Sequence, residues 1–536
     1  MSPEDLPHVQ SLIDDPLLRI RTLYQVKSAR DGNMVPFIPT PEQEIILNAI
    51  HRDGLKKIII LKARQLGMST VINVIMADLQ IWNGGWQGTI VDEDHKAAAL
   101  KLKYKVKAAF ESMPAEIRSL FLIVSSNESE FAVRFKGTAA DQVSTTFAGK
   151  NARGGTNQFL HISEWGPIQH QDPPRSEEIM TGAIPSAKEG IVAIETTWKG
   201  GKGGHLWSLT ERAITTLPEH VTAEDYTLFF FPWHADPQYR TTGDFSQIPE
   251  SIHAYFDDKE AYLTSTGKPH TFTPEQRLWY YKVALPKGNQ RYAEYPTTLE
   301  ECFLAPVPGA IYAQLIDQAR AEGRIADFPW SREHPVHTFW DLGSPENTRV
   351  AYVQFVGREI HVIDYDSGLD LTPAQRVAHL RAKGYTYHTH HLPHDAAARE
   401  RGGLNFEDQL KQAGLAPLTI IPQTNNLWTG INKMTELLPR IWFHKSRCEK
   451  LIAGLDAYHT REDRTNPGHQ TSTPVHDWAS HDADAFRYIG EAMAAGLVKN
   501  GPQPPPPRVI SPIEGLGDVT PHVVRRRREG KVVTAM

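Results

Sequence analysis

The chain has 536 residues, of which 40% are hydrophobic and 22% charged, so it holds enough apolar surface for more than one core. Its 57 basic and 63 acidic residues give a net charge of −6, which does not mark it as a nucleic-acid-binding protein. Two cysteines exclude a disulfide framework, and no apolar run reaches the roughly 20 residues that a membrane-spanning helix needs. We therefore expect two to four soluble domains in a reducing compartment, without a signal peptide or a membrane partner.

The first strong pattern is Lys57-Ile-Ile-Ile-Leu-Lys62, a β-branched run that predicts a strand buried on both faces. Apolar residues then recur at helical spacing from Val71 to Ile81, after the polar pair Ser69-Thr70 that suits a helix N-terminus. Three later apolar runs predict further strands, at 88–91, 159–162 and 191–194. Strands alternating with helices favour a mostly parallel α/β sheet.

Between that strand and helix lies Lys62-Ala-Arg-Gln-Leu-Gly-Met-Ser-Thr70, which has the context of a phosphate-binding loop. Gly67 and Ser69 fall at the second glycine and the magnesium-binding hydroxyl of the G-x-x-x-x-G-K-[ST] pattern. Met68 stands where the lysine normally lies, so the positive charge must come from Lys62 or Arg64. The alternative is an ordinary strand-to-helix turn.

A second run, Phe159-Leu-His-Ile-Ser-Glu164, predicts a buried strand that ends in an acid. Glu164 is suited to polarise an attacking water, whereas Ser163 replaces the usual metal-binding aspartate. The simpler interpretation of Glu164 is a solvated strand end. Alternating lysines at positions 101, 103, 105 and 107, and the basic run at 525–528, are more typical of solvated surface than of phosphate contacts.

A second unit begins near residue 330 with three predicted strands, at 336–341, 349–355 and 359–364, followed by helices. Acids occur at Asp341, at Asp395, and at Asp482 and Asp484 in a late helix whose positive end favours carboxylates. Each one alone is more typical of a cap or a surface residue. An acid on the first strand, another on a later strand and a third on the last helix is the order of a ribonuclease-H-like nuclease that uses two divalent metals.

These segments resemble the large terminase subunits of tailed bacteriophages, the motors that package DNA into procapsids. In the ATPase half the resemblance is carried by Arg-Gln-Leu-Gly-x-Ser-Thr, His-Ile-Ser-Glu and Ile-Glu-Thr-Thr197. In the nuclease half it is carried by Asp-Leu-Gly, Pro-His-Asp and Asp-Ala-Phe-Arg-Tyr, so that it covers most of residues 35–495.

The resemblance implies roles for individual residues. Arg64 matches the loop arginine, Gln43 the adenine-contacting glutamine, and Arg153 is the arginine-finger candidate. Asp484 matches the third nuclease acid, and Asp482 is a second choice because helical spacing turns it away. The predicted nucleotide-binding set is Gln43, Lys62, Arg64, Gln65, Gly67, Met68, Ser69, Thr70 and the coupling pair Thr196 and Thr197. The predicted metal ligands are Ser69, Asp341, Asp395, Asp482 and Asp484.

The resemblance also implies an architecture. We expect a P-loop (RecA/ASCE-like) ATPase domain over residues 1–325 and an RNase H-like α/β nuclease domain over 326–498. A Pro-rich, basic tail over 499–536 is predicted to be disordered alone.

The function implied is ATP-driven translocation of double-stranded DNA with cleavage of concatemers, using ATP and Mg²⁺, with Mn²⁺ an alternative at the nuclease site. The implied partners are DNA, a portal protein, a small terminase subunit and further copies in a ring, a pentamer by family analogy. The implied location is the host cytoplasm, with transient docking at the procapsid portal. The alternatives are a helicase- or repair-type ATPase fused to a nuclease, and an inert structural capsid-associated protein.

Overall fold

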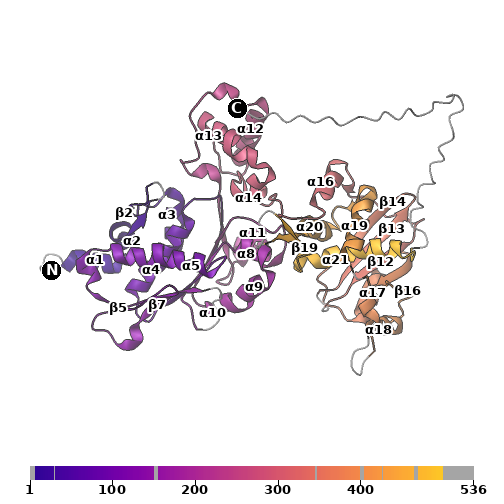
Figure 1. Cartoon of the computed structure of the whole chain (residues 1–536), viewed down its shortest axis with the longest axis horizontal. Helices are drawn as coiled ribbons and strands as arrows, with labels where there is room; N and C mark the ends of the chain where they lie inside the picture. Colours follow the sequence, from indigo (N-terminus) through magenta and orange to yellow (C-terminus); the bar gives the residue numbers. More distant parts are fainter. Residues whose placement is uncertain are drawn as a thin grey trace, which may run out of the picture.

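The computed structural model describes residues 6–28, 31–149, 155–343, 347–398, 404–424, 426–463 and 469–498. Within these ranges, every helix is too short or too polar to cross a membrane. The described residues form two α/β units that lie side by side along the long axis of the molecule (Figure 1). We call them the first and the second unit.

The first unit is built on an eight-stranded sheet with the order β10-β3-β9-β8-β4-β7-β6-β5. The six strands from β10 to β7 run parallel, and β6 and β5 add antiparallel to the edge. The predicted α/β class with a mostly parallel sheet is confirmed. The strands are β3 (Lys57–Lys62), β4 (Gln87–Val91), β5 (Phe121–Ser126), β6 (Glu130–Phe135), β7 (Ser144–Gly149), β8 (Phe159–Ser163), β9 (Ile191–Thr196) and β10 (Thr227–Phe231).

Strand β3 shows why its sequence is apolar throughout. All six of its residues are buried, and alternate side chains enter two different cores. Ile58 and Ile60 pack in one core, while Ile59 and Leu61 pack in the core on the opposite face. The main helices of this unit are α3 (Pro41–His51), α4 (Met68–Trp82), α5 (His95–Lys101), α8 (Trp165–Gln171), α9 (Pro173–Glu178), α11 (Gly204–Thr215), α12 (Glu250–Ser265), α13 (Pro274–Trp279) and α14 (Arg291–Glu294).

The second unit is built on a seven-stranded sheet with the order β11-β17-β14-β13-β12-β15-β16. Strands β12, β13 and β14 are antiparallel neighbours, and β15 and β16 then run parallel to β12. This is the RNase H-like arrangement that the acid order predicts. The strands are β11 (Ile325–Ala326), β12 (Val336–Asp341), β13 (Arg349–Val356), β14 (Glu359–Asp366), β15 (Tyr387–Leu392), β16 (Leu418–Ile420) and β17 (Ile441–His444).

The helices of the second unit are α16 (Ala313–Ala321), α17 (Pro373–Ala382), α18 (Phe406–Gln412), α19 (Leu427–Leu437), α20 (Glu449–Ala457) and α21 (Trp478–Ala494). Val307, Tyr312 and Ile316 belong to the core of this unit, although they precede the predicted boundary at 325/326. The hydrophobic contacts therefore place α16 with the second sheet. The predicted tail, residues 499–536, lies outside the described residues, so its disorder stays a prediction.

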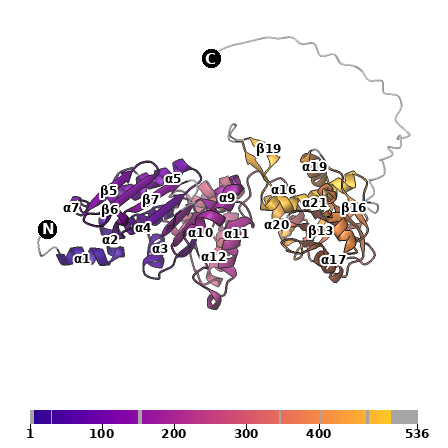
Figure 2. The ribbon, with the colours of Figure 1, turned by 90° about the horizontal axis from the view of Figure 1, so that it is seen from below.

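The two units touch where α9 and α11 (Figure 2), and α8 beside them (Figure 1), approach α20 and the hairpin of β18 (Thr460–Glu462) and β19 (Gln470–Pro474). The His170 ring in α8 stacks on His459 with 4.2 Å between ring centroids. At the same boundary, a Cβ added to Gly203 would lie 2.4 Å from the ring of Trp478, the first residue of α21. The loop that follows β9 therefore lies directly against the last helix of the second unit.

Candidate nucleotide and nuclease sites

The loop of residues 62–70, here the phosphate loop, connects β3 to α4 with two residues of positive φ, Gln65 at 59° and Gly67 at 72°. Gly67 caps α4, which begins at Met68, slightly earlier than Ser69-Thr70 suggested. Gln65 and Glu164 are the two non-glycine residues with positive φ in the described part of the chain. Such backbone strain concentrates at functional sites, and here it falls on the two segments predicted to handle phosphate and water.

Gln43 fastens this loop to α3. Its Nε2 donates to the carbonyl of Gly67 at 3.0 Å, and its Oε1 accepts from the Thr40 amide at 3.0 Å as half of a capping box. Both ends of the buried amide therefore have protein partners. The adenine contact implied for Gln43 stays a prediction.

The outer side of the loop is braced by the segments that follow β10. The Arg64 amide donates to the carbonyl of Glu294 at 2.9 Å, and the Tyr239 hydroxyl donates to the carbonyl of Arg64. The Arg64 guanidinium lies 3.8 Å from the Glu294 carboxylate and is 53% exposed. Arg64 is therefore a solvent-facing cation at the mouth of the loop.

Lys62, at the start of the phosphate loop, and Met68, near its end, are both buried. Met68 is buried in the main core of the first unit. Lys62 is also buried, and its Nζ lies 3.2 Å from Glu164 Oε1 and 3.1 Å from Glu195 Oε2. Burial alone would lower the pKa of Lys62, but the two carboxylates outweigh it and raise that pKa. A fixed positive charge therefore sits at the end of β3.

Glu164 lies between this lysine and the end of β9. Its Oε2 accepts from the Thr197 amide at 3.2 Å and from the Thr197 hydroxyl at 3.3 Å, and it lies 3.5 Å from the Thr196 hydroxyl. Thr196 in turn accepts from the Gly166 amide in α8. The predicted water-handling acid thus contacts the predicted coupling pair directly.

Glu195 was not singled out by its sequence pattern, yet it is the most connected acid of the site. Its Oε1 accepts from Ser69 Oγ at 2.5 Å and from Ser163 Oγ at 2.7 Å. Lys101 reaches the same cluster, because its Nζ donates to Ser163 at 2.7 Å and pairs with Asp92. Its sequence signal was its place in the Ile-Glu-Thr-Thr197 segment at the end of β9, in which roles were predicted for the two threonines and not for the acid. Lys101 corrects the expectation of a merely solvated basic stretch.

The three strand ends that carry these groups are neighbours. Strands β3, β9 and β8 are adjacent and parallel, so Lys62, Glu195 and Ser163 meet at one edge of the sheet. Thr70 lies in the first turn of α4, where its amide bonds to the Gly67 carbonyl. Arg153, the arginine-finger candidate, lies outside the described residues.

In the second unit, Asp341 ends β12 and lies against α21. His481 Nδ1 is 3.3 Å from Asp341 Oδ2, an interaction that raises the pKa of His481. Burial raises the pKa of Asp341, and the nearby Asp484 raises it further, against the effect of His481. Asp484 is itself held at 3.0 Å by Arg487. Asp341 and Asp484 are therefore close enough for the charge of Asp484 to affect Asp341.

Asp482 faces elsewhere, as the helical spacing predicted. It is buried, accepts a hydrogen bond from the Tyr365 hydroxyl and lies 3.1 Å from Arg349 Nε. Burial raises its pKa to about 6. One expectation about this helix was wrong: α21 begins at Trp478 and is capped by Asp477, so the favourable helix end lies at Asp477, while Asp482 and Asp484 lie further along.

Asp395 lies in a short turn (His394–Ala397) directly after β15, the parallel neighbour of β12. The strand order therefore sets it at the same sheet edge as Asp341, but its side chain is exposed. Among the residues that the structure describes, no three His, Cys, Asp or Glu side chains are grouped closely enough to hold a metal ion. The predicted carboxylates thus do not form a metal centre in this structure.

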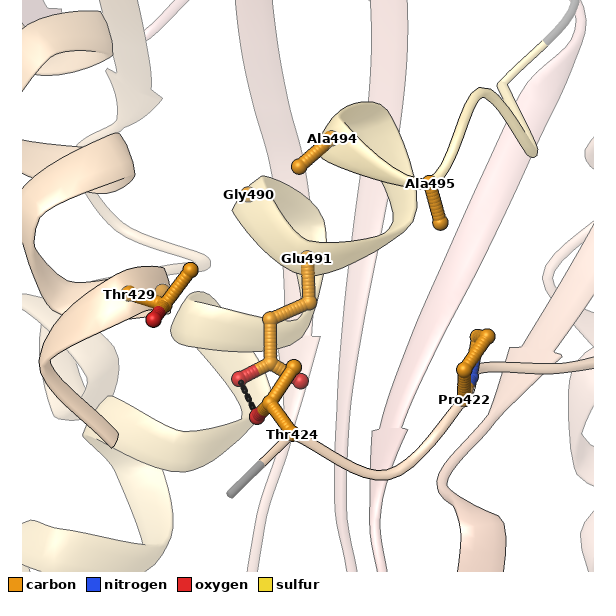
Figure 3. Close-up of a pocket in the computed structure, with 8 residues that line it drawn as sticks. Pro422, Thr424, Thr429, Gly490, Glu491, Ala494 and Ala495 are labelled. Carbon is orange, nitrogen blue, oxygen red and sulfur yellow. Dashed lines mark hydrogen bonds between the residues drawn. The ribbon is translucent and has the colours of Figure 1, made fainter. Parts of the chain in front are cut away.

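A small pocket of about 110 Å³ lies between α19 and the end of α21 (Figure 3). Glu491 lines it and accepts from the Thr424 hydroxyl at 3.0 Å. None of the predicted site residues lines this pocket, so it is separate from the acids near Asp341. Its lining consists of Pro422, Thr424, Thr429, Gly430, Gly490, Glu491, Ala494 and Ala495.

No protein-family model and no curated protein matches the chain. In structure, the chain is similar to large terminases of several bacteriophages. The HK97 bacteriophage large terminase is 12% identical, with 90% of this chain and 99% of that chain covered and a TM-score of 0.45. The large terminase ATPase domain of Thermus phage P74-26 is 18% identical, with 49% and 94% covered and a TM-score of 0.31. The P22 large terminase nuclease domain is 18% identical, with 32% and 89% covered and a TM-score of 0.25.

Proposed function

We propose that this chain is a viral DNA-packaging enzyme whose first unit hydrolyses ATP to move double-stranded DNA and whose second unit cuts it. The observation that carries the proposal is the cluster at the edge of the first sheet. Lys62 and Glu164 lie 3.2 Å apart beneath a strained loop at the start of α4, and Glu164 contacts Thr197. The cluster thus contains a cation that can bind phosphate, Lys62, and an acid that can orient water, Glu164. Glu164 also connects the cluster to the end of β9 through Thr197.

The residues of the phosphate loop fit a magnesium nucleotide. Free amides at the start of a helix favour phosphate groups, and Lys62 supplies the charge that Met68 lacks. The Ser69 hydroxyl, in the first turn of α4, is the oxygen available to the cation, which when bound would neutralise charge on the phosphates. In this scheme Glu164 orients the attacking water, and its contacts with Thr196 and Thr197 transmit the change in the pocket to the end of β9.

For the second unit we propose cleavage of DNA that depends on a divalent cation, with Asp341, Asp484 and Asp395 as the acids. The strand order supports this assignment, since β12 and β15 are adjacent and α21 packs against β12. The described carboxylates do not form a metal centre, so we derive no cleavage step through a bound metal. Asp482, which is occupied by Arg349 and Tyr365, is left out of the proposed set.

The proposal extends to partners. We propose that duplex DNA is gripped mainly through its phosphates and independently of sequence. A portal protein, a small terminase subunit that selects the DNA, and a ring of copies of this chain complete the machine, which works in the host cytoplasm and docks at the procapsid portal. Arg153 would act between neighbouring copies of the ring.

The ATPase half is tested by DNA-stimulated ATP hydrolysis of the full chain. Glu164→Gln should lower turnover by about 100-fold or more, because the water loses its acid. A comparison of turnover in Lys62→Ala and in Arg64→Ala shows which cation hydrolysis requires, the buried one or the exposed one. Arg52→Ala, which removes an exposed arginine paired with Asp53, is the control and should leave turnover unchanged. Full turnover in all three site variants would reject the assignment of the loop.

The nuclease half is tested by cleavage of plasmid DNA with Mg²⁺ or Mn²⁺. Asp341→Ala should abolish cleavage, whereas Asp370→Asn, at an exposed acid of the same unit, should not change it. Glu164→Gln should still cut, because its defect lies in the first unit. Cleavage that survives in Asp341→Ala would show that the acid assignment is wrong.

A further inference from the structure

Strand β8, which is followed by Glu164, has no carboxylate at its last residue, the position where an acid is expected to hold a nucleotide-bound magnesium ion. Strand β8 ends in Ser163, and a hydroxyl holds a divalent cation or its water more weakly than a carboxylate does. Ser163 is paired in register with Glu195 on the neighbouring strand β9. Its hydroxyl donates to Glu195 Oε1 at 2.7 Å, so the serine orients an acid that the adjacent strand provides.

Glu195 is bound to the phosphate loop as well as to β8. Ser69 Oγ, the predicted magnesium ligand, donates to Glu195 Oε1 at 2.5 Å. Lys62 Nζ lies 3.1 Å from Oε2, and His161 Nε2 lies 3.5 Å from Oε1. One carboxylate therefore connects the cation, the hydroxyl and the strand end that together define a nucleotide pocket.

The plain alternative is that Glu195 only neutralises Lys62. Two observations favour a further role for Glu195 beyond neutralising Lys62. Lys62 already has Glu164 as a partner, at 3.2 Å. Glu195 is also completely buried, and in addition to the Lys62 ion pair at Oε2 its Oε1 accepts from the Ser69 and Ser163 hydroxyls. Neutralising Lys62 requires neither serine, whereas these two contacts hold the carboxylate between the phosphate loop and the end of β8.

We propose that Glu195 is the carboxylate that holds the magnesium ion of the bound nucleotide, together with Ser69, in place of an acid at the end of β8. This inference rests on the proposed ATPase function and specifies its metal ligand. Ser163 is then a positioning residue that acts through Glu195, and Lys101 fixes Ser163 in turn, at 2.7 Å. The carboxylate that holds magnesium would then come from β9 instead of from the end of β8.

The test measures binding rather than turnover, on the full chain. A fluorescent ADP analogue is titrated with and without Mg²⁺, and bound Mn²⁺ is followed by electron paramagnetic resonance. In Glu195→Gln, binding of the analogue without cation should stay within about twofold of the original, whereas the affinity for Mn²⁺ should fall about 10- to 100-fold. Moving the acid back to β8, in the double variant Ser163→Asp with Glu195→Gln, should restore much of the Mn²⁺ affinity.

Glu301→Gln is a matched control, because Glu301 is also buried and paired with a lysine, Lys259, at 2.8 Å. It should leave the Mn²⁺ affinity unchanged. If Glu195→Gln does not fold, Glu195→Asp decides, since it keeps the charge but withdraws it by one methylene, and it should also weaken Mn²⁺ binding.

Two failures can be told apart. An unaltered chain that binds no nucleotide under any condition would reject the ATPase function itself. An unaltered chain that binds the Mn²⁺ nucleotide, with Glu195 variants that bind it equally well, would overturn only the role of Glu195.

Discussion

At Gly67 two separate constraints require a residue without a side chain. Its φ is +72°, and a Cβ there would lie 2.6 Å from Gln43 Nε2. Gly54 has nearly the same φ, +71°, with nothing within 4 Å of its Cβ position. The two glycines therefore separate the cost of backbone conformation from the cost of the contact with Gln43.

We expect Gly54→Ala to cost about 1 to 2 kcal/mol, the conformational term alone. Gly67→Ala should cost more and should also weaken nucleotide binding, because it pushes Gln43 away from the loop. Thermal melting and titration with the fluorescent nucleotide measure the two effects. Adding Gln43→Ala to Gly67→Ala should recover the part due to the contact, and equal losses in both glycine variants would contradict this account.

At the scale of elements, α21 is attached to the second sheet by a buried ion pair. Arg349 in β13 lies 3.1 Å from Asp482, and both side chains are nearly inaccessible, at 13% and 7%. Removal of one partner from a buried pair leaves an uncompensated charge. Asp482 therefore has a structural explanation that does not involve catalysis.

We expect Arg349→Ala to destabilise the second unit by about 3 kcal/mol or more in chemical denaturation. The double variant Arg349→Ala with Asp482→Asn should lose less, because no charge is then left alone. Arg320→Ala is the comparison, since this arginine is 42% exposed and its pairs should contribute about 1 kcal/mol or less. A double variant as unstable as the single one would argue against a charge effect.

Strands that are buried on both faces could be recognised from the sequence, as β3, β8 and β9 demonstrate, because continuous apolar runs leave few alternatives. The contacts of Glu195 could not, since they depend on which strands are neighbours and on their register. Likewise, α16 packs in the second core through a few apolar residues in a stretch that looks like a linker. Local patterns predicted the elements, and contacts between distant segments determined the site.

At the scale of the whole molecule, the boundary between the units contains a group that must stay uncharged. Burial, together with smaller effects of His459, Lys199 and Arg461, lowers the pKa of His170 to about 3. Because the folded-state pKa lies below the ordinary value of 6.5, the stabilisation is complete above that value and is lost as the pH falls toward 3. The contact should weaken by about 1.4 kcal/mol for each pH unit below about 6.5.

We therefore expect acidification from pH 7.5 to 5.5 to separate the units, seen as expansion in small-angle X-ray scattering and as faster proteolysis between them. His170→Phe keeps the stacking on His459 without a titrating group, so it should remove this pH dependence. His220→Phe, at an exposed histidine, should leave it unchanged. A pH response that persists in His170→Phe would mean that another group controls the boundary.

The loop that follows β9 has one further consequence. Thr197 bonds to Glu164 beside the phosphate loop, and a few residues later Gly203 lies against Trp478 at the start of α21. The same helix contains Asp484, whose charge affects Asp341. Under the proposed function, loss of the γ-phosphate that shifts this loop would act on the start of α21 directly, so that one short stretch of backbone would link DNA movement to DNA cleavage.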